Sequence, residues 1–408
     1  MVTGASPLQS AMTKYWGYRD FRPLQREAME AVLAGRDSVV VLPTGGGKSL
    51  CFQVPAVVRP GLAVVVSPLI SLMKDQVDTL VGNGVPAAVL NSSLGAAEKS
   101  DVLTGLREGR FRLLYVSPER LVADGRDAFL GMLRGCGVSF IAIDEAHCIS
   151  QWGHDFRPEY RQLARLREVL PDVSVHAYTA TATARVRRDI ATQLALRQPA
   201  EFVGSFDRPN LVYRVLPRAV LKRQLTEALA RHRGEAGIIY CTSRREVDAL
   251  AAWLSQSGSR ALPYHAGLSD DERNRHQDAF LNERADIVVA TVAFGMGIDR
   301  SDVRFVIHAG APRSVEHYQQ EAGRAGRDGL EAECLLIYSA DDFLRWRLLL
   351  ERNGELSDAG VALLRHMERY ATAVGCRHRH LSAYFGDQAP ASDCAACDVC
   401  LGVLESAP

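Results

Sequence analysis

The feature that most constrains this chain is a repeated pairing of a short apolar run with a helical pattern. Five runs rich in β-branched residues occur between Asp37 and Thr179, namely DSVVVL, LAVVVS, FRLLYVS, VSFIAID and VSVHAYT. Turn residues and then a helical pattern follow each run. Continuous apolar runs that alternate with helices are typical of a mostly parallel sheet with crossover helices. We therefore expect an α/β domain over residues 1–204.

The same alternation begins again after the segment SFDRPN (205–210). Its apolar runs are LVYRVL, AGIIYC, ADIVVAT, VRFVIHA and AECLLIY, which predict a second α/β domain over residues 205–340. From Asp341 onward the strand pattern stops, and two helical patterns lead into a group of cysteines. This predicts a third domain over residues 341–408 that is small and helical.

The composition is that of a folded protein. Hydrophobic residues make up 47% of the 408 residues and charged residues 24%, which excludes disorder as the main state. The 48 Lys and Arg residues balance the 48 Asp and Glu residues, so the total charge gives no sign of a polyanionic partner. The chain shows neither a secretory signal nor an apolar run of membrane-spanning length, so we expect it in the cytosol.

A glycine-rich loop follows the first apolar run, in VVVLPTGGGKSL (39–50). Glycines allow backbone N–H groups to converge on phosphate oxygens, Lys48 can reach the β- and γ-phosphates, and Ser49 can bind Mg²⁺. The first glycine of the strict phosphate-loop pattern is replaced by Leu42, so the pattern matches only in part. The alternative is a glycine-rich turn with a chance Lys-Ser pair.

Two carboxylates follow a second apolar strand, in FIAIDEAHC (140–148). We assign Asp144 to Mg²⁺ binding and Glu145 to activation of the attacking water. An Asp-Glu pair at a strand end is often merely solvated, but its place after TGGGKS favours a nucleotide hydrolase. The two segments together therefore predict an ATP site in the first domain.

An arginine pair offers the positive charge that a transferring phosphoryl group needs. Arg324 and Arg327 lie in QQEAGRAGRDG (319–329), and their spacing predicts one helical face bracketed by glycines. An ordinary surface pair is the alternative. Because these arginines belong to the second predicted domain and Lys48 to the first, we expect ATP to bind between the domains.

An aromatic-rich segment follows the two carboxylates directly, in SQWGHDFRP (150–158). It contains Trp152, His154, Phe156 and Arg157. Aromatic rings stack on nucleic-acid bases and arginines meet phosphates, so this segment suits single-strand binding. A buried aromatic cluster that closes the domain is the alternative.

The ordered set of segments resembles the RecQ family of superfamily 2 DNA helicases. The resemblance covers nearly the whole chain, from YWGYRDFRPLQ (15–25) to the terminal cysteines, and its most specific part is IDEAHCISQWGHDFRPEY (143–160). It implies two tandem RecA-like parallel-sheet motor domains and a small helical zinc-binding domain. It also implies that the aromatic-rich segment couples DNA binding to ATP hydrolysis.

The resemblance further implies an adenine site and a γ-phosphate site. Gln25 would pair with the adenine edge, Tyr18 would stack on the base with Arg22 nearby, and Arg327 with Arg324 would face the γ-phosphate. The expected ATP and Mg²⁺ site comprises Tyr18, Arg22, Gln25, Thr44, Gly45, Gly46, Gly47, Lys48, Ser49, Asp144 and Gln320.

Small polar residues at strand ends are further candidates for DNA contact. Their hydroxyls, amides and neighbouring N–H groups would bind phosphates without reading sequence, although each is also an ordinary cap or turn residue. Together with the aromatic-rich segment, the candidates are Ser67, Ser117, Thr179, Asn210, Ser243, Arg244, His265 and Thr291.

Four cysteines near the end of the chain have metal-ligand spacing. Cys376 is followed by Cys394, Cys397 and Cys400 in Cys-x₂-Cys-x₂-Cys order, and four thiolates complete a tetrahedral Zn²⁺ site. Iron–sulfur ligation is an alternative, as is a histidine, His378 or His380, in place of one cysteine. The resemblance favours zinc, because the family has a zinc unit at this position.

These expectations add up to an ATP- and Mg²⁺-dependent DNA helicase in recombination or repair, and the resemblance alone implies that it moves 3′ to 5′. Its partners would be single-stranded and tailed duplex DNA, with no membrane, and it would act as a monomer whose protein partners, such as a single-strand binding protein, stay open. In a bacterium it would associate with the nucleoid. The family commonly continues into a winged helix, whereas this chain ends eight residues after Cys400. An ATP-hydrolysing binding module with little strand separation is therefore the alternative, followed by an RNA-remodelling helicase.

Overall fold

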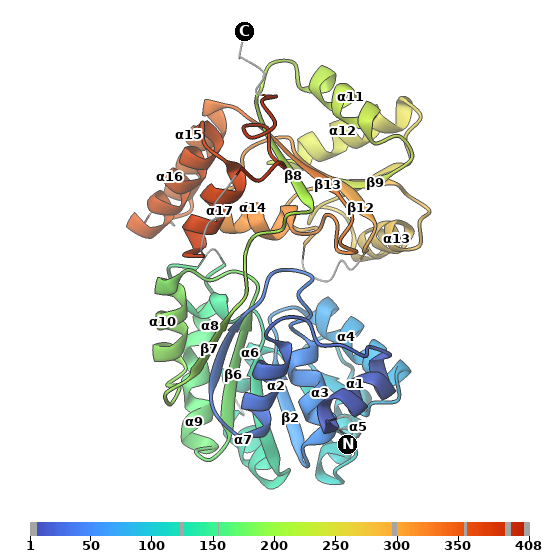
Figure 1. Cartoon of the computed structure of the whole chain (residues 1–408). Helices are drawn as coiled ribbons and strands as arrows, with labels where there is room; N and C mark the ends of the chain where they lie inside the picture. The colour runs from blue at the N-terminus through green and yellow to red at the C-terminus, as the bar shows by residue number, and fades with distance from the viewer. Residues whose placement is uncertain are drawn as a thin grey trace, which may run out of the picture. The chain divides into compact units, whose positions relative to one another are not determined.

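The computed structural model describes residues 6–122, 126–153, 155–295, 300–354, 357–387 and 393–403. Two compact units make up the chain, residues 1–204 and residues 205–408, as Figure 1 shows. The predicted third domain lies within the second unit. Each unit is described by itself below.

The first unit is built on a seven-stranded sheet in which every adjacent pair is parallel. In spatial order its strands are β3 (Ala87–Leu90), β4 (Leu113–Val116), β2 (Leu62–Val66), β5 (Val138–Ile143), β6 (Ser174–Thr179), β1 (Ser38–Val41) and β7 (Ala200–Val203). The five predicted runs form the five inner strands. Both edge strands, β3 and β7, were absent from the prediction.

Helices cover both faces of this sheet. They are α1 (Pro7–Trp16), α2 (Gln25–Leu33), α3 (Leu50–Val58), α4 (Ile70–Gly82), α5 (Ala96–Arg107), α6 (Pro118–Val122), α7 (Arg126–Gly135), α8 (Pro158–Arg161), α9 (Arg165–Val169) and α10 (Ala184–Gln193), with 3₁₀ turns η1 (Ala146–Ile149) and η2 (Gln162–Ala164). Phe52 on α3 packs edge-on against Tyr178 of β6, with ring centroids 5.1 Å apart. This core fixes α3, whose first turn follows the glycine-rich loop.

The second unit contains a six-stranded sheet, again with parallel neighbours throughout. Its spatial order is β10 (Ala261–Tyr264), β11 (Ile287–Ala290), β9 (Ala236–Tyr240), β12 (Val303–His308), β13 (Ala332–Tyr338) and β8 (Leu211–Pro217). The five predicted runs are strands here too, and β10 at one edge was not predicted.

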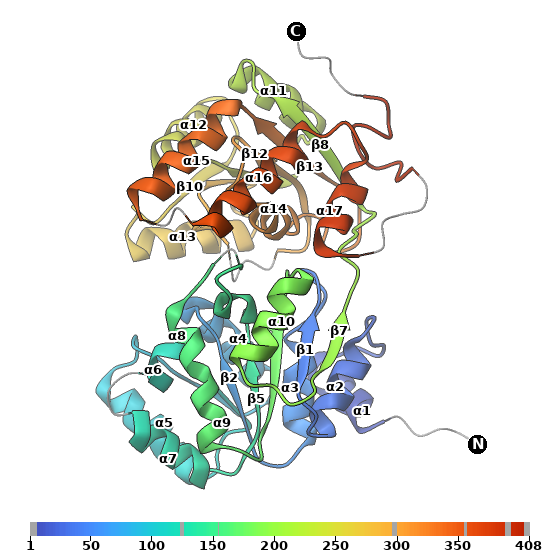
Figure 2. The same ribbon diagram turned by 90° about the vertical axis from the view of Figure 1, so that its left-hand side faces the viewer.

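The helices of the second unit are α11 (Leu221–Arg231), α12 (Arg244–Gln256), α13 (Asp270–Leu281), α14 (Val315–Ala322), α15 (Ala340–Arg352), α16 (Asp358–Thr372) and α17 (Arg377–Phe385). The first four lie between strands in the chain, and the last three follow β13. The last three pack side by side next to α14, as Figure 2 shows. This confirms the two parallel-sheet units and the further helical content, and the bounds of the third domain stay a prediction.

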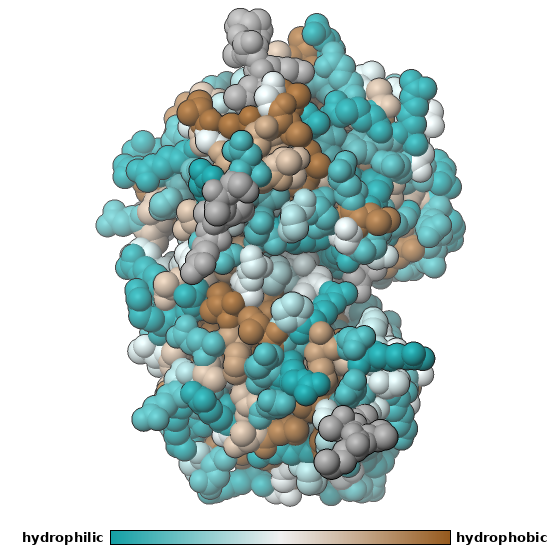
Figure 3. Space-filling view, viewed as in Figure 1, coloured by the Kyte–Doolittle hydropathy of each residue, from teal (hydrophilic) through white to brown (hydrophobic). Residues whose placement is uncertain are grey.

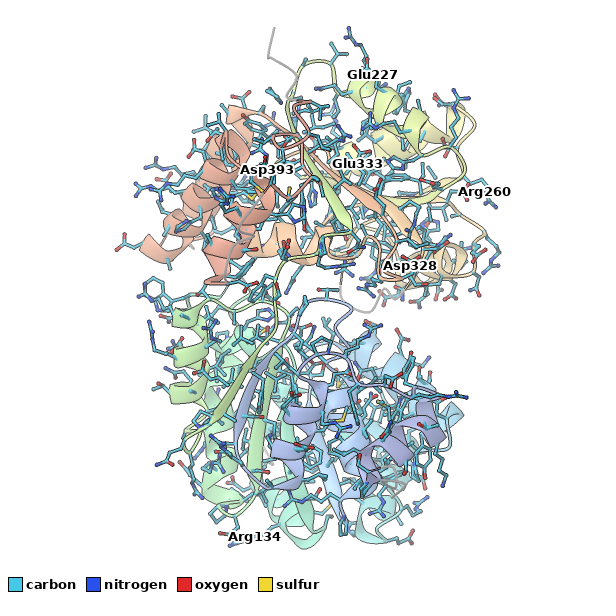
Figure 4. All side chains as sticks on the ribbon, in the orientation of Figure 1. Arg134, Glu227, Arg260, Asp328, Glu333 and Asp393 are labelled. Carbon is cyan, nitrogen blue, oxygen red and sulfur yellow. The ribbon has the colours of Figure 1, made fainter. Side chains whose placement is uncertain are left out.

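Oppositely charged side chains pair over the surface. Arg260 bonds Asp286, with Nε 2.8 Å from Oδ2, and an Arg304 guanidinium nitrogen lies 2.6 Å from an Asp328 oxygen; Arg260 and Asp328 are labelled in Figure 4. The face drawn in Figure 3 is mostly hydrophilic, with hydrophobic residues in patches. Among the described residues, no helix has the length and hydropathy of a membrane span.

Candidate nucleotide, nucleic-acid and metal sites

The glycine-rich loop has a backbone that needs its glycines. Gly45 and Gly47 have φ angles of +79° and +75°, in the left-handed region that disfavours side chains. A Cβ on Gly46 would lie 2.8 Å from the carbonyl oxygen of Pro43. Because the loop leads straight into α3, it presents a helix N-terminus as well as its own N–H groups, a setting that fits a bound phosphate.

Two of the predicted adenine-site residues contact this loop. The Gln25 amide nitrogen lies 3.2 Å from the Gly47 carbonyl oxygen, and its oxygen accepts from the Arg22 backbone N–H at 2.8 Å. The Arg22 guanidinium donates to the Gly45 carbonyl. Gln25 is therefore buried, whereas Tyr18 is 55% exposed. Their contacts with adenine stay predictions.

The predicted phosphate and Mg²⁺ ligands lie at the start of α3. The Lys48 ammonium donates to the Leu42 carbonyl at 3.1 Å. The Ser49 hydroxyl accepts from the Gln76 amide at 3.3 Å, and the Gln76 oxygen accepts from the Tyr115 hydroxyl at 2.7 Å. Gln76 on α4 and Tyr115 in β4 are supporting residues that were not predicted. Thr44 is half-buried in the loop.

The two carboxylates directly follow the central strand β5. Asp144 is 5% exposed, and one of its oxygens accepts from the Glu145 backbone N–H at 3.0 Å. Burial raises the pKa of Asp144 to about 7, the charge of Glu145 acts in the same direction, and the charge of Lys48 opposes it. A divalent cation would reverse this shift, so the buried carboxylate beside Lys48 fits a Mg²⁺ ligand.

A histidine links these carboxylates to the neighbouring strand β6. The Nδ1 atom of His147 lies 2.8 Å from the Thr179 hydroxyl and 3.3 Å from a Glu145 carboxylate oxygen. Thr179 is fully buried in this arrangement. The structure therefore places this predicted DNA contact against His147, which in turn contacts Glu145. The role of Thr179 at DNA stays a prediction.

The aromatic-rich segment is held by arginines. The Arg185 guanidinium carbon lies 3.1 Å from the ring centroid of the half-buried Trp152, and the Arg161 guanidinium carbon lies 5.1 Å from that of Phe156. Arg157 donates to the Pro68 carbonyl at 3.2 Å and to the Asp155 carboxylate at 3.3 Å. These pairings differ from the buried aromatic cluster that was the alternative. His154 lies outside the described residues.

The remaining DNA candidates of the first unit are buried strand-end residues. Ser67 follows β2 and is 1% exposed, and Ser117 follows β4 and is 8% exposed. The Ser117 carbonyl accepts from the Arg120 N–H at 3.1 Å and so begins α6. Both side chains are buried, and their assignment to DNA contact stays a prediction.

Several candidates of the second unit have partners within the chain. His265 lies 2.9 Å from an Asp248 oxygen, and the Ser243 hydroxyl caps α12 by accepting from the Glu246 N–H at 3.3 Å. Thr291 is half-buried, and Arg244 is exposed at the start of α12. Arg244 and Ser243 are the exposed members of this set.

The predicted arginine pair lies in a turn rather than on a helix. Helix α14 ends at Ala322, so the expectation of one helical face is wrong; Gly326 adopts a φ of +56°, which a helix does not allow. Arg324 is 6% exposed and Arg327 is half-buried. Gln320 is half-buried on α14.

Two residues that follow the start of the second unit hold this turn in place. The Arg208 guanidinium donates to the carbonyls of Gly323 at 2.9 Å and Gly326 at 2.6 Å. The Asn210 amide donates to the carbonyls of Gly326 and Leu330, both at 2.9 Å. Asn210, predicted to contact DNA, thus positions the arginine turn, and Arg208 is a supporting residue that was not predicted.

The four predicted metal ligands come together. The sulfur atoms of Cys376, Cys394, Cys397 and Cys400 all lie within 4.8 Å of one another. The Ala396 N–H points to the Cys394 sulfur and the Cys400 N–H to the Cys397 sulfur, each at 3.4 Å. Such N–H groups stabilise thiolates, so the cluster fits a tetrahedral Zn²⁺. Figure 4 labels Asp393, whose carboxylate lies 3.9 Å from the Cys400 sulfur.

The histidine alternative at this cluster is excluded for His378. Its Nδ1 atom lies 2.5 Å from an Asp207 oxygen, and its Nε2 atom lies 3.0 Å from the Leu211 carbonyl oxygen. With both ring nitrogens engaged elsewhere, His378 is a structural residue. The grouped ligand atoms likewise do not include those of His380.

The cysteine segment is fixed to the edge strand β8. The Tyr213 N–H donates to the Ala396 carbonyl at 3.0 Å, and the Asp398 N–H donates to the Tyr213 carbonyl at 2.9 Å. The Asp398 carboxylate accepts from the Val215 N–H at 2.9 Å and from the buried Arg377 guanidinium at 2.9 Å. The cysteine cluster is therefore built into the second unit.

Solved structures share this fold at low sequence identity. The DEAD-box helicase Mss116, bound to single-stranded RNA, gives a TM-score of 0.68 at 18% identity over 86% of this chain and 76% of that one. The Mycobacterium smegmatis helicase Lhr, bound to single-stranded DNA and AMP-PNP, gives 0.64 at 20% identity over 86% and 50%. These likenesses establish two RecA-like units.

Three family descriptions match successive parts of the chain. Residues 22–190 match the DEAD/DEAH box helicases, residues 220–329 the helicase conserved C-terminal domain, and residues 340–401 the RecQ zinc-binding domain. The last match favours zinc over an iron–sulfur cluster.

Curated relatives align with nearly the whole chain. The ATP-dependent DNA helicase RecQ of Pasteurella multocida is 46% identical over 95% of this chain and 61% of its own length, and that of Bacillus subtilis is 44% identical over 96% and 66%. The RecQ-like DNA helicase BLM of Xenopus laevis is 42% identical over 95% and 30%. The chain thus spans less than two thirds of the length of these relatives. With this identity and these matches, the chain belongs to the RecQ family of helicases.

Proposed function

We propose that this chain is the ATP-driven motor of a DNA helicase that moves 3′ to 5′ along single-stranded DNA and separates strands in recombination or repair. It would act as a monomer on single-stranded and tailed duplex DNA. The observation that carries the proposal is the short segment 144–157, which joins the buried Asp144 and the half-buried Glu145 to an aromatic and arginine-bearing surface. A nucleotide site and a single-strand site are then parts of one segment.

Each residue of the nucleotide site has a role that follows from its chemistry. Lys48 and the loop N–H groups would hold the phosphates, and Ser49 with Asp144 would hold Mg²⁺, which supplies charge neutralisation when bound. Glu145, fixed by His147, would orient the attacking water. Arg324 and Arg327 would contribute the positive charge that stabilises the negative charge developing during phosphoryl transfer.

The route from DNA to hydrolysis runs through contacts already described. His147 contacts both Glu145 and Thr179, and Arg157 in the aromatic-rich segment bonds the backbone at Pro68 just after β2. A base that stacks on this segment would therefore displace groups one or two contacts away from the acidic pair. This supports a DNA-stimulated ATPase.

The decisive experiment combines an ATPase assay with strand displacement. We expect single-stranded DNA to stimulate ATP hydrolysis, and a 3′-tailed duplex to be separated in preference to a 5′-tailed one. DNA-stimulated hydrolysis with no separation would leave a DNA-switched ATPase and overturn the unwinding part of the proposal. Stronger stimulation by single-stranded RNA would instead make the chain an RNA-remodelling enzyme.

A further inference from the structure

One face of Trp152 is covered by a side chain that the nucleotide site does not use. Arg185 is the second residue of α10, and its guanidinium carbon lies 3.1 Å from the centroid of the Trp152 ring. The arginine is exposed and the tryptophan is half-buried. The covered face is therefore one that solvent, or a ligand in solution, would otherwise reach.

Both partners are held by local backbone contacts. The Trp152 N–H donates to the Ser150 hydroxyl at 3.2 Å, and the Thr183 hydroxyl caps α10 by accepting from the Val186 N–H at 3.4 Å. Helix α10 also packs on η1, the turn that carries His147. The pairing is thus set by two anchored segments rather than by two free loops.

A guanidinium and a nucleic-acid base use the same surface of an indole ring. Both are planar, and both stack face to face at van der Waals distance. A guanidinium 3.1 Å from the centroid leaves no space for a base on that face. A stacked base contributes more than an exposed cation–π contact, so nucleic acid can win this competition.

We propose that Arg185 closes the stacking face of Trp152 in the absence of nucleic acid, and that single-stranded DNA binds there by displacing it. This inference rests on the proposed function, because it assumes that the aromatic-rich segment is a DNA site. It adds a residue outside that segment that sets how readily the site opens. The free energy of DNA binding then includes the cost of displacing Arg185 from the Trp152 ring.

The closed face is tested first without DNA. Acrylamide quenching is measured on the part of the tryptophan emission that Trp152→Phe removes. We expect Arg185→Ala to make this emission more accessible to the quencher and Arg188→Ala to leave it unchanged, since Arg188 is an exposed arginine of the same helix. Equal quenching in all three proteins would mean that Arg185 does not cover the ring in solution.

The competition is tested by fluorescence anisotropy with a labelled oligo-dT strand. We expect Arg185→Ala to tighten binding about two- to five-fold relative to Arg188→Ala, which removes the same charge. The gain should vanish in a Trp152→Ala background, where no stacking face remains to be covered. Weakening of the same size in Arg185→Ala and Arg188→Ala would make Arg185 an ordinary phosphate contact and overturn the proposal.

The two tests separate this inference from the proposed function. If the unaltered protein fails to bind oligo-dT while Arg185→Ala still raises quenching, the ring contact is real but both the DNA site and its closure are refuted. If the unaltered protein binds oligo-dT and quenching does not change, the DNA site stands and only the role of Arg185 is refuted.

Discussion

At the scale of single residues, side chains of the nucleotide site are held by backbone carbonyls. Lys48 bonds the Leu42 carbonyl, Gln25 the Gly47 carbonyl and Arg22 the Gly45 carbonyl. Each donor is thereby kept near the loop that a phosphate would occupy. A bound nucleotide would therefore have to draw these donors away from the loop carbonyls to which they are hydrogen-bonded.

Replacing Lys48 tests the phosphate role directly. We expect Lys48→Ala to lower the ATPase rate by on the order of 100-fold or more, because the charge that neutralises the phosphates is lost. Lys74→Ala, at an exposed position on α4, is the matched control and should retain the rate. A steady-state phosphate-release assay measures both, and a normal rate in Lys48→Ala would remove this lysine from the site.

Sequence reasoning singles out residues whose chemistry lies in a local pattern. The loop around Lys48, the Asp144–Glu145 pair and the Cys394–Cys400 run are each short local patterns, and Cys376 lies shortly before that run. Supporting contacts such as Arg208 to Gly326 or Arg185 to Trp152 join residues far apart in the chain. They depend on tertiary packing and on rotamers, which no local pattern encodes.

At the scale of elements, the strands that escaped prediction share one position. β3, β7 and β10 each have four residues and lie at a sheet edge. An edge strand has only one hydrogen-bonded neighbour and less burial, so it needs no long apolar run, and β10 even contains Pro263. Inner strands were predictable because burial on both faces demands continuous apolar sequence.

A buried acid joins three elements of the second unit. Glu333 on β13 lies 2.6 Å from both Arg231 at the end of α11 and His232, and 3.1 Å from Arg214 of β8. Burial by itself would raise the pKa of Glu333, but the hydrogen bonds from His232 and Arg231 outweigh it and hold the pKa below its usual value. The pKa of His232 is raised, because its hydrogen bonds to Glu333 and Glu235 outweigh desolvation.

These shifts predict a pH window for stability. The lowered pKa of Glu333 gives stability that is lost as pH falls through its folded value, and the raised pKa of His232 gives stability that is lost as pH rises through its folded value. Glu333→Gln should therefore cost about 2 kcal/mol, most clearly between about pH 4.5 and 6.5.

Urea unfolding over a pH series measures this cost. Glu227→Gln is the control, because its partner Arg223 is 77% exposed and a surface pair contributes little. Glu227 and Glu333 are both labelled in Figure 4. A cost for Glu333→Gln that does not change with pH would contradict the assignment.

Zinc removal is the second test at this scale. Cys397→Ser should lose stoichiometric zinc and lower the unfolding midpoint of the second unit by on the order of 10 °C, since a structural metal contributes folding energy. Cys136→Ser, outside the cluster, should change neither quantity. A zinc-dye assay and differential scanning calorimetry give the two readouts, and retained zinc in Cys397→Ser would show that the ligand set is different.

At the scale of the whole molecule, basic and acidic residues are equal in number, so their formal charges cancel. Basic and acidic residues number 48 each, and many are neutralised in pairs such as Arg304 with Asp328. Four thiolates with one Zn²⁺ would bring the formal charge two units below zero. On the proposed function, DNA affinity would then come from local donors and from stacking.

The salt dependence of DNA binding follows from this balance. We expect the slope of log Kd against log salt to correspond to fewer than about four ion pairs, because few phosphates would be neutralised directly. Anisotropy titrations with oligo-dT at a series of salt concentrations measure the slope. A value that implies about eight or more ion pairs would mean that an extended basic surface binds the strand.

The hydrogen bonds between the cysteine segment and β8 have a consequence for solubility. β8 is the longest edge strand in the molecule's described residues, with seven residues, and its outer backbone groups are occupied at Tyr213 and Val215 by the segment that the cysteines shape. Oxidation of the thiols or a shortage of zinc in the cell would free that edge for pairing with a strand of another molecule. The metal would then protect a folded motor from aggregation, so zinc supply would govern how much of it stays in solution.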